Sequence, residues 1–185
     1  MQKLPNPAPH GGRRSRAQIR YIVLHGAVEG SMPPGTSVHY LVDEEHVQRC
    51  VPVRFAAWHC GTRGAYFHPY CRNANSIGIA MCTRRQAGRE TLPLAAARRA
   101  QALVRALMAR YGIPPENVLR HYDVTHKTCP VPLVERAADW AAFRAALDGR
   151  KNAESGQLSA GSSGESGASS SDADRPNGIN RNGIR

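Results

Sequence analysis

The sequence predicts a single α/β domain in which a central mixed β-sheet is flanked by helices. Three observations favour this class: two apolar, strand-like segments lie on either side of an alternating segment, an amphipathic helical pattern follows them, and a shorter helical pattern comes last. With 185 residues the chain can bury one sizeable core, and we expect no second domain.

The strands are expected in the first half of the chain. Residues 18–25 are apolar and β-branched in their second half, which is typical of a buried strand. Apolar and polar residues alternate loosely over residues 36–50, and the acidic run 43–45 supplies the charged turn of a hairpin. Residues 75–82 predict another strand, in which large and small side chains alternate: one face carries Ile77, Ile79 and Met81, and the other carries Gly78, Ala80 and Cys82.

The helices are expected in the second half. Apolar residues recur every three or four positions ahead of Gly112, at Leu103, Val104, Leu107, Met108 and Tyr111. Pro93 suits the first turn of this helix, and Gly112 followed by two prolines ends it. A last helix is expected over residues 132–147, with an inward stripe of Trp140, Phe143 and Leu147.

The two ends of the chain differ in composition from this domain, which we expect over residues 19–149. Residues 1–18 are rich in Pro, Gly and Arg and predict a flexible basic segment. Residues 150–185 predict a disordered tail, because eight serines and six glycines occur there with almost no large apolar groups.

The net charge of +11 lies outside the tail, because residues 151–185 hold four basic and four acidic side chains. Such an excess predicts an anionic partner: nucleic acid, an anionic membrane or an anionic cell-wall polymer. Specific nucleic-acid binding is disfavoured, since the arginines are dispersed, aromatic residues make up 6% of the chain and no recognised binding motif occurs. No apolar run approaches the ~20 residues that span a bilayer, so membrane insertion is not expected.

The five cysteines are an odd number and form no CxxC pair, so a disulfide framework is not expected. Cys50, Cys60, Cys71 and Cys82 are interpreted as small buried apolar residues. A Cys60–Cys71 disulfide stays open as an alternative.

Histidine and cysteine residues at two distant places predict a zinc site. His25 ends the apolar run 21–25, where we expect the strand to end at a sheet edge, and the segment 121–130 brings His121 and Cys129. Two imidazoles and one thiolate can hold zinc through three protein bonds. The fourth tetrahedral position is then left for water, which points to catalysis and away from a structural role.

Two more residues of the late segment belong to this hypothesis. Asp123 lies two residues after His121 and is expected to accept a hydrogen bond that supports a ligand. Lys127 places a cation close to the predicted metal ion. The remaining candidates are interpreted as structural or exposed histidines: His10, His46 and His68.

Five sequence blocks extend this pattern. They are Ile22-Val23-Leu24-His25, Val38-His39-Tyr40-Leu41-Val42-Asp43, Ala57-Trp58-His59-Cys60-Gly61, Asn73-Ala74-Asn75-Ser76-Ile77-Gly78-Ile79, and Leu119-Arg120-His121-Tyr122-Asp123 through Lys127-Thr128-Cys129-Pro130. In this order they resemble the zinc-dependent N-acetylmuramoyl-L-alanine amidases of phage endolysins and bacterial autolysins, which are related to the peptidoglycan recognition proteins. The resemblance covers about residues 15–148, and the five blocks together make a specific signal.

The resemblance implies the fold of these amidases, with one zinc ion held by His25, His121 and Cys129. The implied substrate is peptidoglycan. The implied reaction is hydrolysis of the amide bond between N-acetylmuramic acid and L-alanine by a zinc-bound water, in lysis or remodelling of the cell wall.

The resemblance also implies roles around the metal ion. Lys127 matches the position of a cation that stabilises the developing oxyanion. Trp58, His59 and Asn75 match positions that bind substrate in the groove or support its walls, and both roles stay open for these three.

Two positions depart from the family pattern. Ala80 stands where many members carry a glutamate as general base, and Val38 stands where other members carry a tyrosine. A positioned proton acceptor typically contributes ~10²–10⁴ in rate, so a catalytically impaired, zinc-containing peptidoglycan binder is the alternative. Residues 26–38 are also too few and too rich in Pro and Gly for the helix that walls the groove in relatives, and Glu29 in this loop is a candidate replacement carboxylate.

The first residues are basic and proline-rich with no apolar region behind them, so we expect no secretory signal. Together with the resemblance, this implies a protein made in the cytoplasm that acts on the cell wall after release, as phage-type enzymes do.

Overall fold

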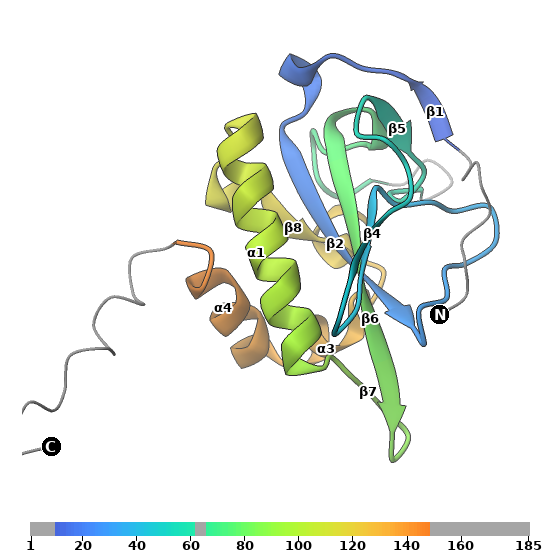
Figure 1. Cartoon of the computed structure of the whole chain (residues 1–185), viewed down its shortest axis with the longest axis vertical. Helices are drawn as coiled ribbons and strands as arrows, with labels where there is room; N and C mark the ends of the chain where they lie inside the picture. Colours follow the sequence, from blue (N-terminus) through green and yellow to red (C-terminus); the bar gives the residue numbers. More distant parts are fainter. Residues whose placement is uncertain (1–9, 62–65, 149–185) are drawn as a thin grey trace, which may run out of the picture. The chain divides into compact units, whose positions relative to one another are not determined.

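Three neighbouring strands of the main sheet run parallel to one another (Figure 1). They are, in spatial order, β6 (Ser76–Gln86), β2 (Tyr21–Val28) and, at the edge, β8 (Val118–Arg120). The structure is a computed structural model that describes residues 10–61 and 66–148, and all of these belong to one unit, Met1–Ala153. The strands expected at residues 18–25 and 75–82 are confirmed. β2 begins later than expected, at Tyr21, and both strands run further, because their ladder continues as far as the Val28–Thr83 pair.

A hairpin and a short antiparallel strand make this sheet mixed. The hairpin consists of β3 (Tyr40–Val42) and β4 (Val47–Arg49), with the acidic run 43–45 in its turn, as expected. β3 runs parallel to β6, and β7 (Arg89–Thr91) pairs antiparallel with the far end of β6. The order along the described sheet is β4-β3-β6-β2-β8, so the α/β class with a central mixed sheet is confirmed.

Helix α1 (Leu94–Tyr111) covers one face of the sheet (Figure 1). The buried core on this face combines side chains of β6 and of α1, among them Ile77, Ile79, Met81, Ala100, Val104 and Leu107. The alternation predicted for β6 is confirmed, since Ala80 and Cys82 belong to a separate apolar cluster. α1 begins directly after Pro93 and ends at Gly112, whose φ of 66° is the left-handed conformation that glycine adopts at little cost.

The last helix is interrupted, whereas one helix was expected over residues 132–147. It consists of α3 (Val131–Glu135) and α4 (Ala137–Ala145), and Arg136 between them is extended, with φ −117° and ψ 94°. Arg136 forms an ion pair of 2.8 Å with Asp139, an acidic residue in the first turn of α4, where negative charge favours the helix dipole. The inward stripe lies in or against the α1 core, as expected, at Trp140, Phe143 and Leu147.

Residues 10–18 are ordered, which contradicts the flexible segment expected over residues 1–18; residues 1–9 lie outside the described residues. β1 (His10–Arg13) pairs antiparallel with β5 (Phe55–Ala57), and a short 3-10 helix, η1 (Arg16–Gln18), follows it. Between β1 and η1, Arg14 is buried, at 8% exposure. It donates hydrogen bonds to three backbone carbonyls, those of Val53, Asn73 and Ser76. This buried anchor explains why the segment is ordered despite its composition.

The remaining described elements are short: η2 (Asn73–Asn75), η3 (Pro115–Asn117) and α2 (His121–Thr125). All five cysteines are free, so the alternative Cys60–Cys71 disulfide is not formed. Cys60 and Cys71 are buried as expected, whereas Cys50 and Cys82 are only partly buried. No helix among the described residues is long and apolar enough to cross a membrane. The tail expected over residues 150–185 lies outside the described part of the chain.

Candidate metal centre

Alternation along β2 puts His25 on the face of the sheet opposite α1. Leu24 points into the α1 core, whereas Val23 belongs to a different cluster, which includes a residue of α2. The expectation that His25 ends its strand at a sheet edge is wrong, because β2 is central and continues to Val28. The neighbouring strand β8 ends at Arg120, the partner of Leu24, so His25 is the first residue of β2 beyond the β8 ladder.

The other two ligand candidates come from the segment that follows β8. His121 is the first residue of α2, and Cys129 lies in the loop between α2 and α3. Two backbone donors hold this loop: Tyr122 N–H donates to the Cys129 carbonyl at 3.0 Å, and Gly26 N–H donates to Cys129 Sγ at 3.4 Å. The end of β8 and the middle of β2 thereby bring two histidines and a cysteine to one place.

These three side chains have the donor types and the proximity that a zinc ion requires. One ligand atom from each of His25, His121 and Cys129 lies within 4.8 Å of the others, and the two imidazole centroids are 4.6 Å apart. Nε2 of His121 is buried and has no hydrogen-bond partner among the described residues, which is costly unless another group satisfies it. Two imidazoles and a thiol are a donor set that zinc accepts, so the residues present fit this ion.

Burial decides the protonation of the three side chains. It lowers the pKa of His25 well below the ordinary value, and burial together with the charge of Lys127 lowers the pKa of His121 to about 4. Both imidazoles are therefore neutral near pH 7 and keep a lone pair for a metal ion. Burial raises the pKa of the Cys129 thiol, so metal binding there would release a proton.

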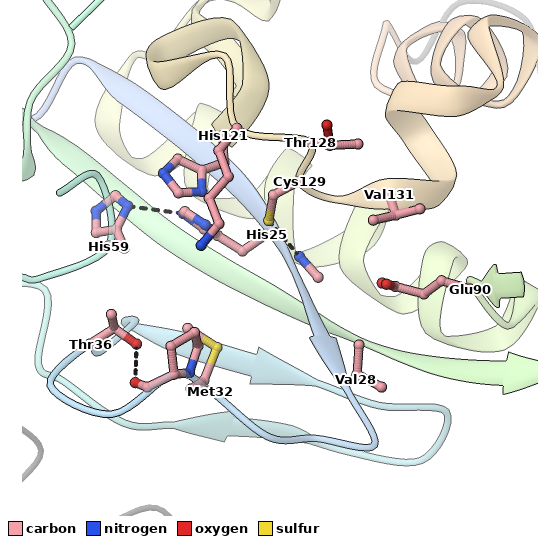
Figure 2. Close-up of a pocket in the computed structure, with 13 residues that line it drawn as sticks. His25, Val28, Met32, Thr36, His59, Glu90, His121, Thr128, Cys129 and Val131 are labelled. Carbon is pink, nitrogen blue, oxygen red and sulfur yellow. Dashed lines mark hydrogen bonds between the residues drawn. The ribbon is translucent and has the colours of Figure 1, made fainter. Parts of the chain in front are cut away.

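The three side chains line a cavity of about 190 Å³ (Figure 2). The other lining residues are Gly26, Val28, Met32, Pro33, Thr36, His59, Glu90, Lys127, Thr128 and Val131. Met32, Pro33 and Thr36 come from the short loop after β2, which contains no helix, as expected. The Thr36 hydroxyl donates to the Pro33 carbonyl at 2.6 Å within this loop, and three residues of the loop line the cavity.

Lys127 is exposed and lines the same cavity. Burial lowers the pKa of His25 and of His121, and the charge of Lys127 adds to this effect, whereas for Cys129 the same charge opposes the rise in pKa that burial causes. Lys127 therefore lies close to all three ligand candidates, as expected from the sequence.

Of the three residues assigned to the substrate groove, His59 lines the described cavity and the other two do not. Trp58 is 46% exposed and outside the lining. Asn75 uses its side chain within the loop before β6: its amide donates to the Tyr70 carbonyl at 2.9 Å, and its oxygen accepts from the Arg72 N–H at 2.8 Å. For Asn75 the structure therefore favours the structural role over substrate contact.

Asp123 has a different partner from the one expected. Within the described residues, its carboxylate bonds to Arg120 and not to a ligand: Oδ2 accepts from the backbone N–H and Oδ1 from the guanidinium, both at 2.7 Å. This pair spans the junction from β8 to α2, so Asp123 stabilises the start of the helix. It affects the position of His121 only indirectly, through that helix.

The two positions that depart from the family pattern lie together. Ala80 and Val38 are fully buried in one apolar cluster, so neither offers a proton acceptor. Glu29, the candidate replacement, lies outside the cavity lining and accepts a hydrogen bond of 3.3 Å from the β6 backbone. The carboxylate that lines the cavity is Glu90 on β7, whose Oε1 accepts from the Thr83 hydroxyl at 2.7 Å. Sequence pattern did not single out Glu90, because only the pairing of β7 with β6 returns it to the cavity.

Comparisons with known proteins agree with each other. The family model described as N-acetylmuramoyl-L-alanine amidase matches residues 15–132. A probable N-acetylmuramoyl-L-alanine amidase of Bacillus licheniformis is 31% identical over 137 residues, which cover 72% of this chain and 38% of the relative. The N-acetylmuramoyl-L-alanine amidase CwlL of the same organism is 32% identical over 118 residues, which cover 61% of this chain and 31% of that protein. The solved catalytic domain of XlyA has a TM-score of 0.59 at 26% identity, covering 78% of this chain and 95% of that domain.

The chain spans about a third of the length of these two curated relatives and nearly all of the solved catalytic domain. The region matched by the family model, residues 15–132, contains all three ligand candidates.

Proposed function

Because this chain belongs to the N-acetylmuramoyl-L-alanine amidase family, we propose that it hydrolyses the amide bond between N-acetylmuramic acid and L-alanine in peptidoglycan. The proposed cofactor is one zinc ion, held by His25, His121 and Cys129. The alternative of a peptidoglycan binder without turnover is not favoured, since the matched relatives are amidases.

The observation that carries this proposal is the buried Nε2 of His121, which has no hydrogen-bond partner in the described part of the chain and belongs to a three-ligand set that lines a cavity. A structural zinc site normally closes with four protein ligands. Three ligands beside a cavity leave a coordination position for water, which is the arrangement of a hydrolytic site.

The cavity supplies the other requirements of amide hydrolysis. Zinc, when bound, polarises the scissile carbonyl and lowers the pKa of a bound water toward ~7. Lys127 provides positive charge where the carbonyl oxygen becomes anionic. Met32, Pro33 and Val131 line the cavity with apolar side chains.

Glu90 is the proposed proton acceptor, because it is the carboxylate among the described residues that line the cavity. We expect Glu90→Gln to lower the release of new amines from purified cell walls by about 10²-fold, since a positioned acceptor contributes at least this factor. Glutamine keeps an oxygen for the Thr83 hydroxyl, so the zinc content should not change. The matched control is Glu29→Gln, outside the cavity, which should release amines at the wild-type rate. Equal losses in both variants would reject the assignment.

Metal removal tests the function as a whole. The purified protein is expected to hold about one zinc per chain and to release free L-alanine amines from purified cell walls, and chelation should stop the release and lower the melting temperature. Absence of zinc from the purified protein would reject both the amidase and the binder. Zinc without amine release would support the binder.

The proposed site of action is the bacterial cell wall, reached after release from the cytoplasm as for a phage-type endolysin, or from outside as for an autolysin. The excess positive charge of +11 favours approach to anionic wall polymers. Nucleic acid and membrane insertion have no part in this proposal.

A further inference from the structure

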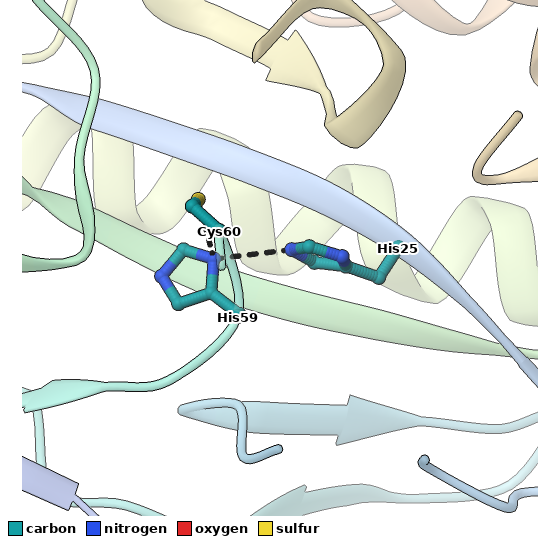
Figure 3. A group of neighbouring side chains, drawn as sticks. All are labelled: His25, His59 and Cys60. Atoms are coloured by element: carbon teal, nitrogen blue, oxygen red, sulfur yellow. Dashed lines mark hydrogen bonds between the residues drawn. The ribbon is translucent and has the colours of Figure 1, made fainter. Parts of the chain in front are cut away.

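A chain of buried polar groups leads from His25 into the sheet. Nε2 of His25 lies 3.1 Å from Nδ1 of His59, and Figure 3 shows the two rings joined by this contact. Nε2 of His59 lies 3.2 Å from Ser76 Oγ, and Ser76 Oγ lies 2.7 Å from the carbonyl oxygen of Arg72. His25, His59 and Ser76 are all buried.

The direction of each hydrogen bond in this chain follows from its last member. A carbonyl oxygen only accepts, so the single Ser76 hydroxyl proton goes to Arg72. Ser76 Oγ must then accept from His59, which puts the ring proton of His59 on Nε2. Nδ1 of the neutral His59 ring consequently carries a lone pair. Both Nε2 of His25 and Sγ of Cys60 lie 3.1 Å from it, and since a thiol is only a weak donor, it accepts from the Nε2–H of His25. His25 is left with its lone pair on Nδ1.

The backbone of β6 makes room for this arrangement at Gly78. A Cβ at position 78 would lie 2.7 Å from Cγ of His59, which is closer than real Cβ contacts. The absence of a side chain therefore lets the His59 ring lie against the strand, where it reaches His25 and Ser76 together.

A competing arrangement uses the same side chains as metal ligands. His25, His59 and Cys60 also bring ligand atoms within 4.8 Å of one another, and Cys60 Sγ lies 3.1 Å from Nδ1 of His59. However, Cys60 is fully buried and outside the cavity lining, whereas His25 and His59 line the cavity. Cys129 lines the cavity, which favours the set that contains it.

We propose that His59 is a positioning residue, which holds the proton of His25 on Nε2 and turns Nδ1 toward the metal ion. This inference rests on the proposed function, since it takes His25 as a zinc ligand. Histidine ligands commonly donate their other ring N–H to a neighbouring acceptor, and loss of that acceptor typically costs 10–100-fold in metal affinity. Here a second histidine, oriented by a serine, takes the place of the usual carboxylate or carbonyl.

Zinc affinity, measured by competition with a chromophoric chelator, tests the proposal without use of activity. His59→Leu removes the acceptor and is expected to weaken zinc binding about 10–100-fold. His59→Asn is expected to restore most of the affinity, because its side-chain oxygen can stand near the position of Nδ1. The control His46→Leu alters an exposed histidine outside the cavity and should bind zinc as the wild type does.

The outcomes separate this inference from the proposed function. If His25→Ala abolishes zinc binding while His59→Leu leaves it unchanged, His59 does not position the ligand. A raised KM with unchanged zinc affinity in His59→Leu would assign His59 to substrate instead. Loss of zinc in Cys60→Ala would show that the competing set holds the metal. If His25→Ala keeps full zinc affinity, the proposed metal site itself is wrong.

A measurement on the unmutated protein covers the case in which the His59 variants fail to fold. Nitrogen-15 NMR of the imidazoles in the zinc-free protein reports which ring nitrogen carries the proton. We expect the proton of His25 on Nε2 and that of His59 on Nε2. A proton on Nδ1 of His25 would overturn the proposal.

Discussion

Cys129→Ala is expected to remove bound zinc and to lower the release of amines from cell walls by about 10³-fold or more. The variant leaves two imidazoles for the metal ion, and the Gly26 N–H loses the sulfur to which it donates. A catalytic metal ion contributes several kcal/mol to the stability of the transition state, and about 1.4 kcal/mol corresponds to a tenfold change in rate. Zinc per chain and amine release would be measured on the same preparation.

The matched control is Cys82→Ala. Cys82 is also a partly buried free cysteine, but it lies outside the cavity lining and belongs to a separate apolar cluster. This variant should keep its zinc and its rate of amine release. If Cys129→Ala retained one zinc per chain with normal turnover, the ligand assignment would have to be abandoned.

Arg14→Ala is expected to lower the free energy of unfolding by about 3 kcal/mol or more. Its guanidinium is the donor for the carbonyls of Val53, Asn73 and Ser76, and Nη2 lies 2.7 Å from Nε2 of His39. Removal of one partner from a buried hydrogen bond costs about 1–3 kcal/mol, and several acceptors lose their donor here. Burial lowers the pKa of Arg14 to about 10, so the side chain is still charged at neutral pH. Urea unfolding of the zinc-loaded protein measures the loss.

Arg13→Ala provides the control for Arg14. Arg13 is the preceding residue, is exposed, and lies over the Phe55 ring at 5.9 Å. An exposed substitution of this kind usually changes stability by less than about 0.5 kcal/mol. Equal urea midpoints for the two variants would show that the N-terminal segment is not anchored through Arg14.

Local patterns predicted the longer elements, namely the strands β2 and β6, the β3–β4 hairpin and helix α1. The alternation in residues 75–82 and the helical spacing ahead of Gly112 are properties of neighbouring residues, and both elements formed as expected. The break between α3 and α4 was not predicted, because Arg136 is extended within a segment whose apolar spacing continues across it. The order of residues 10–18 was also missed, since composition does not show that one arginine finds three buried carbonyls.

For the site, residue type and block order were sufficient to choose the ligand candidates, but not their surroundings. Asp123 was misjudged because proximity in sequence to His121 does not decide the partner of a carboxylate; Arg120 lies just as near and carries the opposite charge. Glu90 was missed because it enters the cavity through pairing of β7 with β6.

The sequence by itself determined which atoms are available for chemistry: two imidazoles, one thiol and a lysine, all within the region that matches the amidase family. Only the tertiary structure decided how they are supported. It buries His59 between His25 and Ser76, and it leaves Nε2 of His121 without a hydrogen-bond partner among the described residues. It also lines one side of the cavity with residues of a short loop. The physical reason is that residue type sets what a side chain can donate or accept, whereas burial and hydrogen-bond direction depend on segments that are distant in the chain.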